Sequence, residues 1–129
     1  MVAVLLLSIA LLGVGGMLLL TLKNSQSSME RTQAVIRAHS MLDLLRANKS
    51  NAIIGRYNLT SWTCDPPSSD NDIGSAQALW LASLKDELGA AACGRISCNS
   101  LTCDVSVQWD DSRGQAGNVA EEYTVRTRL

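Results

Sequence analysis

The sequence predicts an α+β protein in which one long N-terminal helix carries a small, disulfide-containing domain with a second, shorter helix and several strands. Three observations predict this class. Residues 1–22 form an uncharged apolar run, and Lys23 follows it directly. From residue 24 to 48 there is no Pro and no Gly, and apolar residues recur at helical spacing. Near the C-terminus, two segments alternate apolar and polar residues, as half-buried strands do.

We divide the chain into three regions. Residues 1–22 are the transmembrane or polymer-packing half of the helix, residues 23–56 its amphipathic half, and residues 57–129 an α+β head domain. A chain of 129 residues is long enough for one domain and an anchor. The part outside the apolar run is large enough to bury a core.

The apolar run matches the roughly 20 residues that a helix needs to cross a bilayer core of about 30 Å. A secretory signal peptide would show basic residues ahead of a shorter apolar stretch, so a retained transmembrane helix is favoured. The same helix could leave the membrane and pack against copies of itself in a polymer. Gly13, Gly15 and Gly16 would allow close helix approach, or they reflect the ordinary glycine content of membrane helices.

The second half of the helix carries one apolar stripe, which we expect to pack on the head domain. Its members recur at steps of three and four residues: Val35, Ala38, Met41, Leu42 and Leu45. The NKSN segment at 48–51 and Gly55 mark the end of the helix. His39 lies next to the stripe and has no partner motif, so we expect it on the helix surface or at its boundary.

The head domain is expected to begin with a loop at residues 62–74, which holds both prolines and three aspartates. The aspartate spacing does not match a calcium-binding EF-hand loop, so we interpret the segment as a solvated turn with helix-capping acids. Residues 75–88 predict a helix that ends at Gly89. Its buried face holds Leu81, Leu84 and Leu88, with Trp80 beside it.

Three strands are expected after this helix, at residues 95–98, 103–109 and 123–129. The first two would form a hairpin across residues 99–102. Residues 110–117 (DDSRGQAG) would form the turn before the last strand.

The four cysteines, Cys64, Cys93, Cys98 and Cys103, indicate disulfides formed in an oxidising compartment. A zinc site is disfavoured because the spacing is wrong and the single histidine lies far upstream. Proximity favours Cys64–Cys93 and Cys98–Cys103, although four cysteines permit three pairings and the sequence alone does not choose. Lys23, directly after the apolar run, favours a cytoplasmic location for the C-terminal part of the chain. The cysteines favour an oxidising compartment instead, and we give them more weight.

Composition and motifs argue against several function classes. The formal net charge is −1 and no basic patch suggests nucleic-acid binding. No nucleophile elbow is present, and the adjacent acids Asp110-Asp111 and Glu121-Glu122 would point to opposite faces of a strand. We therefore expect no catalytic residues, no metal and no cofactor.

Taken together, four segments resemble the type IV pilins, and among them the minor pilins of the type IV pilus modification protein (PilV) family. The apolar run and the segment after it, residues 2–34, resemble that family's anchor and helical stem. The other similar segments are MLDLLRAN at 41–48, VQWDDSRG at 107–114 and YTVRTRL at 123–129. The likeness covers nearly the whole chain and is least diagnostic at residues 57–74.

The resemblance implies a pilin-like fold, in which a helical spine carries a small antiparallel sheet on its C-terminal half. It implies storage in the bacterial inner membrane with the head in the periplasm, followed by incorporation into the extracellular pilus. The implied partners are the major pilin, other minor pilins and the assembly machinery, with roles in assembly priming, twitching motility and surface attachment. The implied membrane and polymer-packing residues are Val4, Leu7, Leu11, Leu12, Gly15, Leu18 and Leu19.

Pilins carry a basic leader that ends in Gly and a Glu at the fifth mature position, where cleavage and methylation occur. The resemblance starts downstream of these positions, so no processing residue is assigned in this sequence. Two alternatives stay open: a minor pseudopilin of type II secretion, and a membrane-anchored periplasmic binding domain that does not polymerise. The Trp109-Asp110-Asp111 strand end and the final Arg-Thr-Arg-Leu favour the pilus version.

Overall fold

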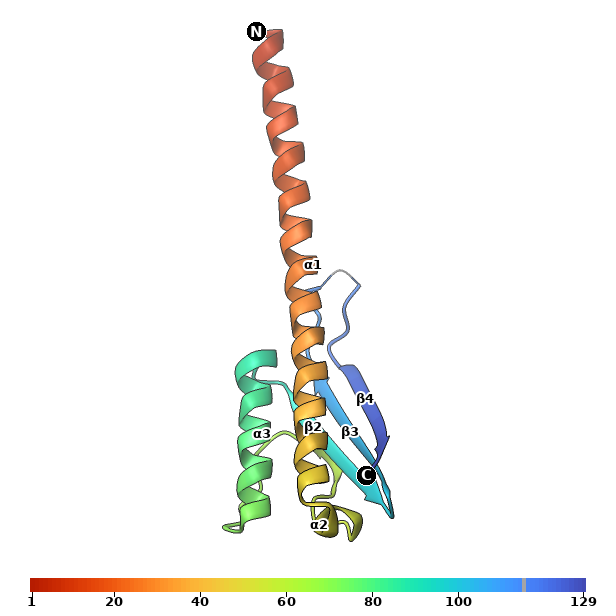
Figure 1. Cartoon of the computed structure of the whole chain (residues 1–129). Coiled ribbons are helices and arrows are strands. Elements are labelled where there is room, and N and C mark those ends of the chain that lie inside the picture. Colours follow the sequence, from red (N-terminus) through yellow and green to blue (C-terminus); the bar gives the residue numbers. More distant parts are fainter. Residues whose placement is uncertain (115) are drawn as a thin grey trace.

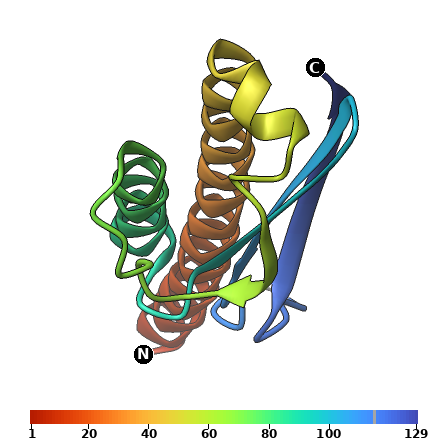
Figure 2. The same cartoon turned by 90° about the horizontal axis from the view of Figure 1, so that it is seen from below.

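The computed structural model describes residues 1–114 and 116–129. Its helices are α1 (Val2–Ala47), α2 (Lys49–Ile53) and α3 (Asp72–Leu88). Its strands are β1 (Leu59–Thr63), β2 (Cys93–Asn99), β3 (Thr102–Trp109) and β4 (Glu121–Arg128). The second half of α1 lies between α3 and the sheet, whereas the first half projects beyond both (Figures 1 and 2). The predicted α+β class, with a long helix packed on an antiparallel sheet, is confirmed.

Helix α1 runs without interruption because its 46 residues contain no proline. Its buried residues repeat every three or four positions and face the head: Glu30, Ala34, Ala38, Met41, Leu42 and Leu45. The predicted stripe is therefore confirmed except at Val35, which is half-buried. The helix ends at Ala47, next to the predicted NKSN segment, and Gly55 adopts a φ of 78° that favours glycine.

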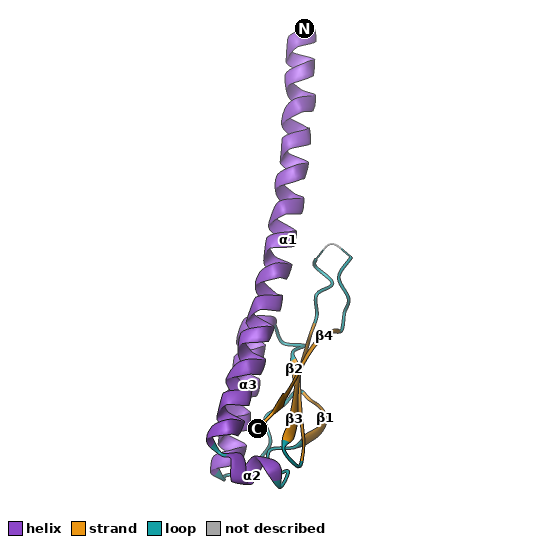
Figure 3. Cartoon of the chain, turned by 45° about the vertical axis from the view of Figure 1, so that its right-hand side comes forward, coloured by secondary structure: helices purple, strands orange, loops and turns teal. Residues whose placement is uncertain are grey.

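The four strands form one antiparallel sheet in the order β1-β2-β3-β4, seen almost edge-on beside the helices in Figure 3. Ile96 pairs with Val105 across the predicted hairpin, and Val105 pairs with Val125 in β4. The alternation predicted for β4 is confirmed, because its half-buried residues alternate with exposed ones. Of the predicted turn at 110–117, residue 115 lies outside the described residues.

The prediction of a loop over residues 62–74 is wrong at both ends. Trp62 and Thr63 belong to β1, a strand that the sequence did not reveal and that pairs with β2. Helix α3 starts at Asp72, three residues earlier than expected, because the Asn71 side chain accepts a hydrogen bond of 2.7 Å from the Gly74 amide. The capping side chain is thus an asparagine, while Asp72 lies in the first turn of the helix.

The core lies where α1, α3 and the sheet meet. Helix α3 contributes the predicted face of Leu81, Leu84 and Leu88, with Trp80 buried beside it. The Trp80 indole nitrogen donates to the backbone carbonyl of Arg37 at 2.9 Å, so the burial of this ring leaves no unpaired polar atom on it. Strands β2 and β3 complete the core with alternate side chains: Ile96, Val105, Val107 and Trp109.

Two disulfides join the cysteines in the pairing that proximity favoured. Cys64–Cys93 ties the end of β1 to the start of β2, and Cys98–Cys103 closes the end of the β2–β3 hairpin. All four cysteines are paired, so none of them is free in the structure. The expected disulfide framework is therefore present.

Candidate functional site

The most prominent surface of the molecule is the apolar first half of α1. It projects away from the head (Figures 1 and 3), and no part of its apolar window is buried within the chain. By length and composition, this helix is capable of spanning a membrane. A soluble fold would leave such a surface in contact with water, so the apolar half needs a lipid or protein environment.

The polar groups within the apolar half are satisfied by the helix itself. The Ser8 hydroxyl donates to the Val4 carbonyl at 2.8 Å, and the Thr21 hydroxyl donates to the Met17 carbonyl at 3.0 Å. Backbone carbonyls accept both bonds, so neither hydroxyl requires water. The first charged side chain after Met1 is Lys23. Residues 2–22 are thus compatible with hydrocarbon along their whole length.

The expected packing residues mostly lie on the side of α1 that faces away from the head. Because 18 residues make about five helical turns, residues 18 positions apart lie on the same side of the helix. Leu11 is therefore aligned with Met29, and Leu18 with Ile36, which are both exposed behind the head. Leu12 and Leu19 differ from the other expected packing residues: Leu19 is aligned with Arg37, whose side chain contacts Glu87 of α3. Leu12 is aligned with Glu30, which is buried against the head.

We call the exposed apolar line on this side the back ridge. Its members are between 51% and 67% exposed: Val4, Leu7, Leu11, Leu18, Leu22, Met29 and Ile36. From Val4 to Ile36, at a rise of 1.5 Å per residue, the ridge is about 48 Å long. It therefore exceeds the roughly 30 Å thickness of a bilayer core. A bilayer core of this thickness would cover only the first part of the ridge, and Met29 and Ile36 would lie beyond it.

The glycines of the apolar half are not required by the fold of the chain. A Cβ atom at Gly13, Gly15 or Gly16 would meet nothing within 4 Å. Their small size therefore serves no contact within the described molecule, and it leaves room for another helix to approach. Gly15 was expected to contribute to packing, and the structure leaves it exposed.

A polar junction fixes α1 to the segment between β3 and β4. The Ser27 hydroxyl donates to the Asp111 carboxylate at 3.0 Å, and Arg31 donates to Glu121 at 2.9 Å. Arg113 lies 3.6 Å from the carboxylate of Glu30, which is only 8% exposed. Burial raises the pKa of the Glu30 carboxyl above its usual value, and the positive charge of Arg113 opposes this rise. These contacts hold the head in a fixed orientation around the helix.

The remaining candidate residues are not gathered into a reactive group. His39 is exposed on α1, as expected, and Asp110 accepts a hydrogen bond from the Ser112 amide while Asp111 is buried. Within residues 1–114 and 116–129, no group of three or more His, Cys, Asp or Glu side chains is placed to hold a metal ion. Among the described residues, the candidate functional site is thus the exposed apolar surface of α1 rather than a cluster of reactive side chains.

Sequence reasoning missed two features: the full length of the back ridge and the burial of Glu30 in the polar junction. It ended the packing surface at residue 22, whereas the ridge continues through Met29 and Ile36. The seven-residue steps from Leu22 to Met29 and to Ile36 were a usable signal, because seven residues are close to two helical turns. The burial of Glu30 gave no signal, since a glutamate in a helix is usually exposed.

Comparisons of this chain with protein-family models, with curated proteins and with solved structures find no match.

Proposed function

We propose that this chain is a minor pilin that acts in the assembly and priming of a type IV pilus. The observation that carries the proposal is the length of the back ridge. A monomeric anchor needs apolar surface only where lipid covers it, yet this ridge continues past the bilayer core to Met29 and Ile36. A helix of a neighbouring subunit would cover the whole ridge in a filament.

Two further features support the proposal. The glycines of α1 would allow close approach of neighbouring helices, because nothing in the chain fills the space beside them. The two disulfides agree with a head domain that matures in an oxidising compartment. We therefore propose that the head lies in the bacterial periplasm while α1 is stored in the inner membrane, before the chain enters the extracellular pilus.

The proposed partners are the major pilin, other minor pilins and the assembly machinery. Priming of assembly would contribute to twitching motility and surface attachment through the pilus as a whole. The chain would act by packing rather than by catalysis, with the back ridge as its contact with neighbouring subunits.

The test compares substitutions on two exposed apolar surfaces. Met29→Ser and Ile36→Ser remove the part of the ridge beyond the bilayer, while Leu79→Ser removes an apolar side chain on α3 that is more exposed than either. In cells that make pili, the amount of the chain in sheared filaments and in membranes is measured by immunoblot. We expect the ridge variants to stay in the membrane and disappear from filaments, and Leu79→Ser to behave as the unmodified chain.

Two results would contradict the proposal. If the unmodified chain remains in membranes and recovers no other pilin in a pull-down, it is an anchored binding domain. If it recovers components of type II secretion instead, it is a pseudopilin.

A further inference from the structure

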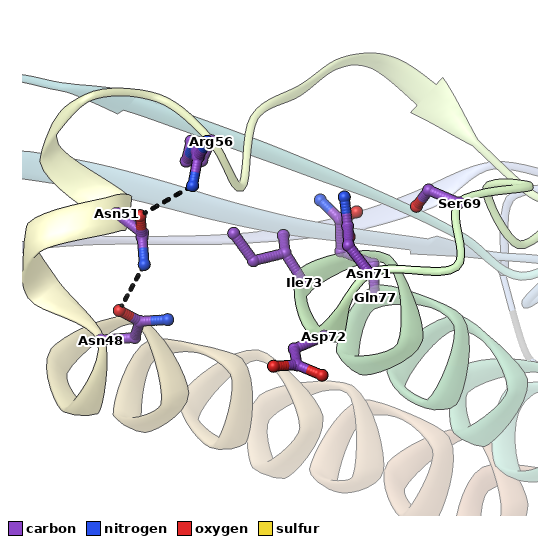
Figure 4. A pocket seen from close by; sticks show the side chains of 8 residues that line it. All are labelled: Asn48, Asn51, Arg56, Ser69, Asn71, Asp72, Ile73 and Gln77. Carbon is purple, nitrogen blue, oxygen red and sulfur yellow. Dashed lines mark hydrogen bonds between the residues drawn. The ribbon is translucent and has the colours of Figure 1, made fainter.

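A polar hollow lies at the end of the head that is farthest from the apolar half of α1. It has a volume of about 430 Å³, within the range of small-molecule sites. Two parts of the chain that are distant in sequence form it (Figure 4). The first is the end of α1 with α2 and the turn after it, contributing Asn48, Asn51 and Arg56; the second is the start of α3 and the loop before it, contributing Ser69, Asn71, Asp72, Ile73 and Gln77.

One wall of the hollow is ordered by a chain of hydrogen bonds. Arg56 donates to Asn51 at 3.4 Å, Asn51 donates to Asn48 at 2.8 Å, and Asn48 donates to the Tyr57 hydroxyl at 2.9 Å. Figure 4 shows the first two of these bonds along the wall. Asn48 and Asn51 are therefore held in position before any ligand arrives, which lowers the entropic cost of binding.

The opposite wall presents polar atoms that the fold leaves unused. Gln77 is only 5% exposed and donates to the Tyr57 carbonyl at 2.9 Å, and its own carbonyl oxygen has no partner among the described residues. Asn71 uses its oxygen to cap α3, which leaves its amide hydrogens free. The side chains of Asp72 and Ser69 form no hydrogen bond or ion pair within the described part of the chain. The Gln77 oxygen, the Asn71 amide and the side chains of Asp72 and Ser69 are therefore available to a polar ligand in the hollow.

The unused atoms include both donors and acceptors, and this mixture restricts the ligand. Asn71 and Arg56 donate, Gln77 and Asp72 accept, and the Ser69 hydroxyl can do either. A phosphate is negatively charged and would be repelled by Asp72, while a metal cation would be repelled by Arg56. Hydroxyl groups both donate and accept, so a neutral compound with several hydroxyls matches the whole set. Ile73 adds an apolar contact for its C–H groups.

We propose that this hollow binds a monosaccharide unit, with Asp72, Asn71 and Gln77 contacting its hydroxyls. The site lies at the far end of the head from the apolar half of α1, outside the residues of the back ridge, and its occupancy does not depend on filament formation. Failure of this inference would leave the proposed pilin function untouched, and the reverse also holds.

The test uses the full chain in micelles of a zwitterionic detergent, since detergents with sugar headgroups would compete. Five probes are titrated separately at millimolar concentrations: D-glucose, D-galactose, D-mannose, N-acetyl-D-glucosamine and N-acetyl-D-galactosamine. Side-chain amide signals are followed by NMR. We expect at least one sugar to shift the amide signals of Asn71 and Gln77, and inorganic phosphate to shift neither.

Matched variants then test the contacts. Asp72→Asn removes the charged acceptor at constant size and should weaken sugar binding at least about tenfold, the usual effect of losing a hydrogen bond to a charged group. Asp70→Asn makes the same change two residues away, at an exposed position outside the hollow, and should have no effect. Ser69→Ala is a second variant that leaves the cap of α3 intact, and it should weaken binding about threefold or more.

Three results would overturn the proposal: none of the five sugars shifts the two amide signals, phosphate shifts them, or Asp70→Asn weakens binding as much as Asp72→Asn does.

Discussion

Single residues decide how closely the elements of the head approach each other, and Gly94 is the clearest case. A Cβ atom at this position of β2 would lie 2.3 Å from the Trp80 ring. The glycine therefore lets the indole of α3 lie against the strand, where its nitrogen also donates to the Arg37 carbonyl. The missing side chain at Gly94 thus lets α1, α3 and β2 pack together around the Trp80 ring.

We predict that Gly94→Ala destabilises the fold by about 1 to 3 kcal/mol, because the added methyl group forces Trp80 out of its position. The free energy of unfolding is measured by urea denaturation of the full chain in micelles. Ser97→Ala is the control, since Ser97 is exposed on the same strand. Equal stability of Gly94→Ala and the unmodified chain would show that the ring can move without cost.

A second prediction at this scale concerns Glu30. Because burial raises its pKa, the folded state holds the Glu30 proton more tightly than the unfolded chain does. This carboxyl therefore costs no stability below its unfolded pKa and becomes destabilising as the pH rises through the folded pKa. We expect Glu30→Gln to be more stable than the unmodified chain at pH 7.

The check is urea denaturation of Glu30→Gln at pH 7 and at pH 4, where the advantage should shrink. Glu122→Gln, at an exposed position of β4, serves as the control. If Glu30→Gln is instead less stable at pH 7, the attraction to Arg113 outweighs the cost of burying the charge.

At the scale of elements, some parts of the fold could be predicted from the sequence and others could not. Helices α1 and α3 and strands β2 to β4 carry regular periods, so their type was evident. Strand β1 lacks alternation: its burial does not repeat every second residue, and its pairing with β2 is irregular. The start of α3 was missed because Asn71, rather than a neighbouring aspartate, provides the cap.

The two disulfides connect different lengths of chain and should differ in their contributions. Cys64 and Cys93 are 29 residues apart, whereas Cys98 and Cys103 are 5 apart. Closing the longer loop removes more entropy from the unfolded chain, about 3.6 kcal/mol against about 2 kcal/mol at 25 °C. We expect the double variant Cys64→Ser/Cys93→Ser to lose about 1.5 kcal/mol more stability than Cys98→Ser/Cys103→Ser.

Urea denaturation of both double variants measures this difference. The two double variants can be compared directly, since each removes one bridge and adds two hydroxyls. A larger loss for the Cys98–Cys103 pair would indicate that the hairpin end, rather than loop length, governs the stability of the head.

At the scale of the whole molecule, a helix about 69 Å long carries the head on its second half only. The apolar half and the stripe under the head were both evident from the sequence. The back ridge beyond residue 22 could have been predicted from its seven-residue steps. The hollow could not, because residues 48–56 and 69–77 meet only after α3 folds back beside α1.

We predict that the apolar half of α1 inserts into lipid bilayers without a partner protein. Leu11→Lys/Leu12→Lys places two charges near the centre of the apolar run and should weaken insertion by about 5 to 7 kcal/mol. Leu79→Lys/Ile54→Lys is the matched control, because these side chains are 74% and 68% exposed but lie on the head and in the turn after α2. Flotation of the purified chain with lipid vesicles gives the bound fraction. Equal flotation of both variants would contradict a membrane role for this half.

The Cys64–Cys93 bridge also determines how the molecule would respond to a pulling force. If tension is applied between the two ends of the chain, the load passes through the covalent bridge from Cys64 to Cys93. The segment between them, residues 65–92 with all of α3, then bears no load, and about 100 Å of chain cannot extend. The helix that buries Trp80 is thereby shielded from direct mechanical unfolding.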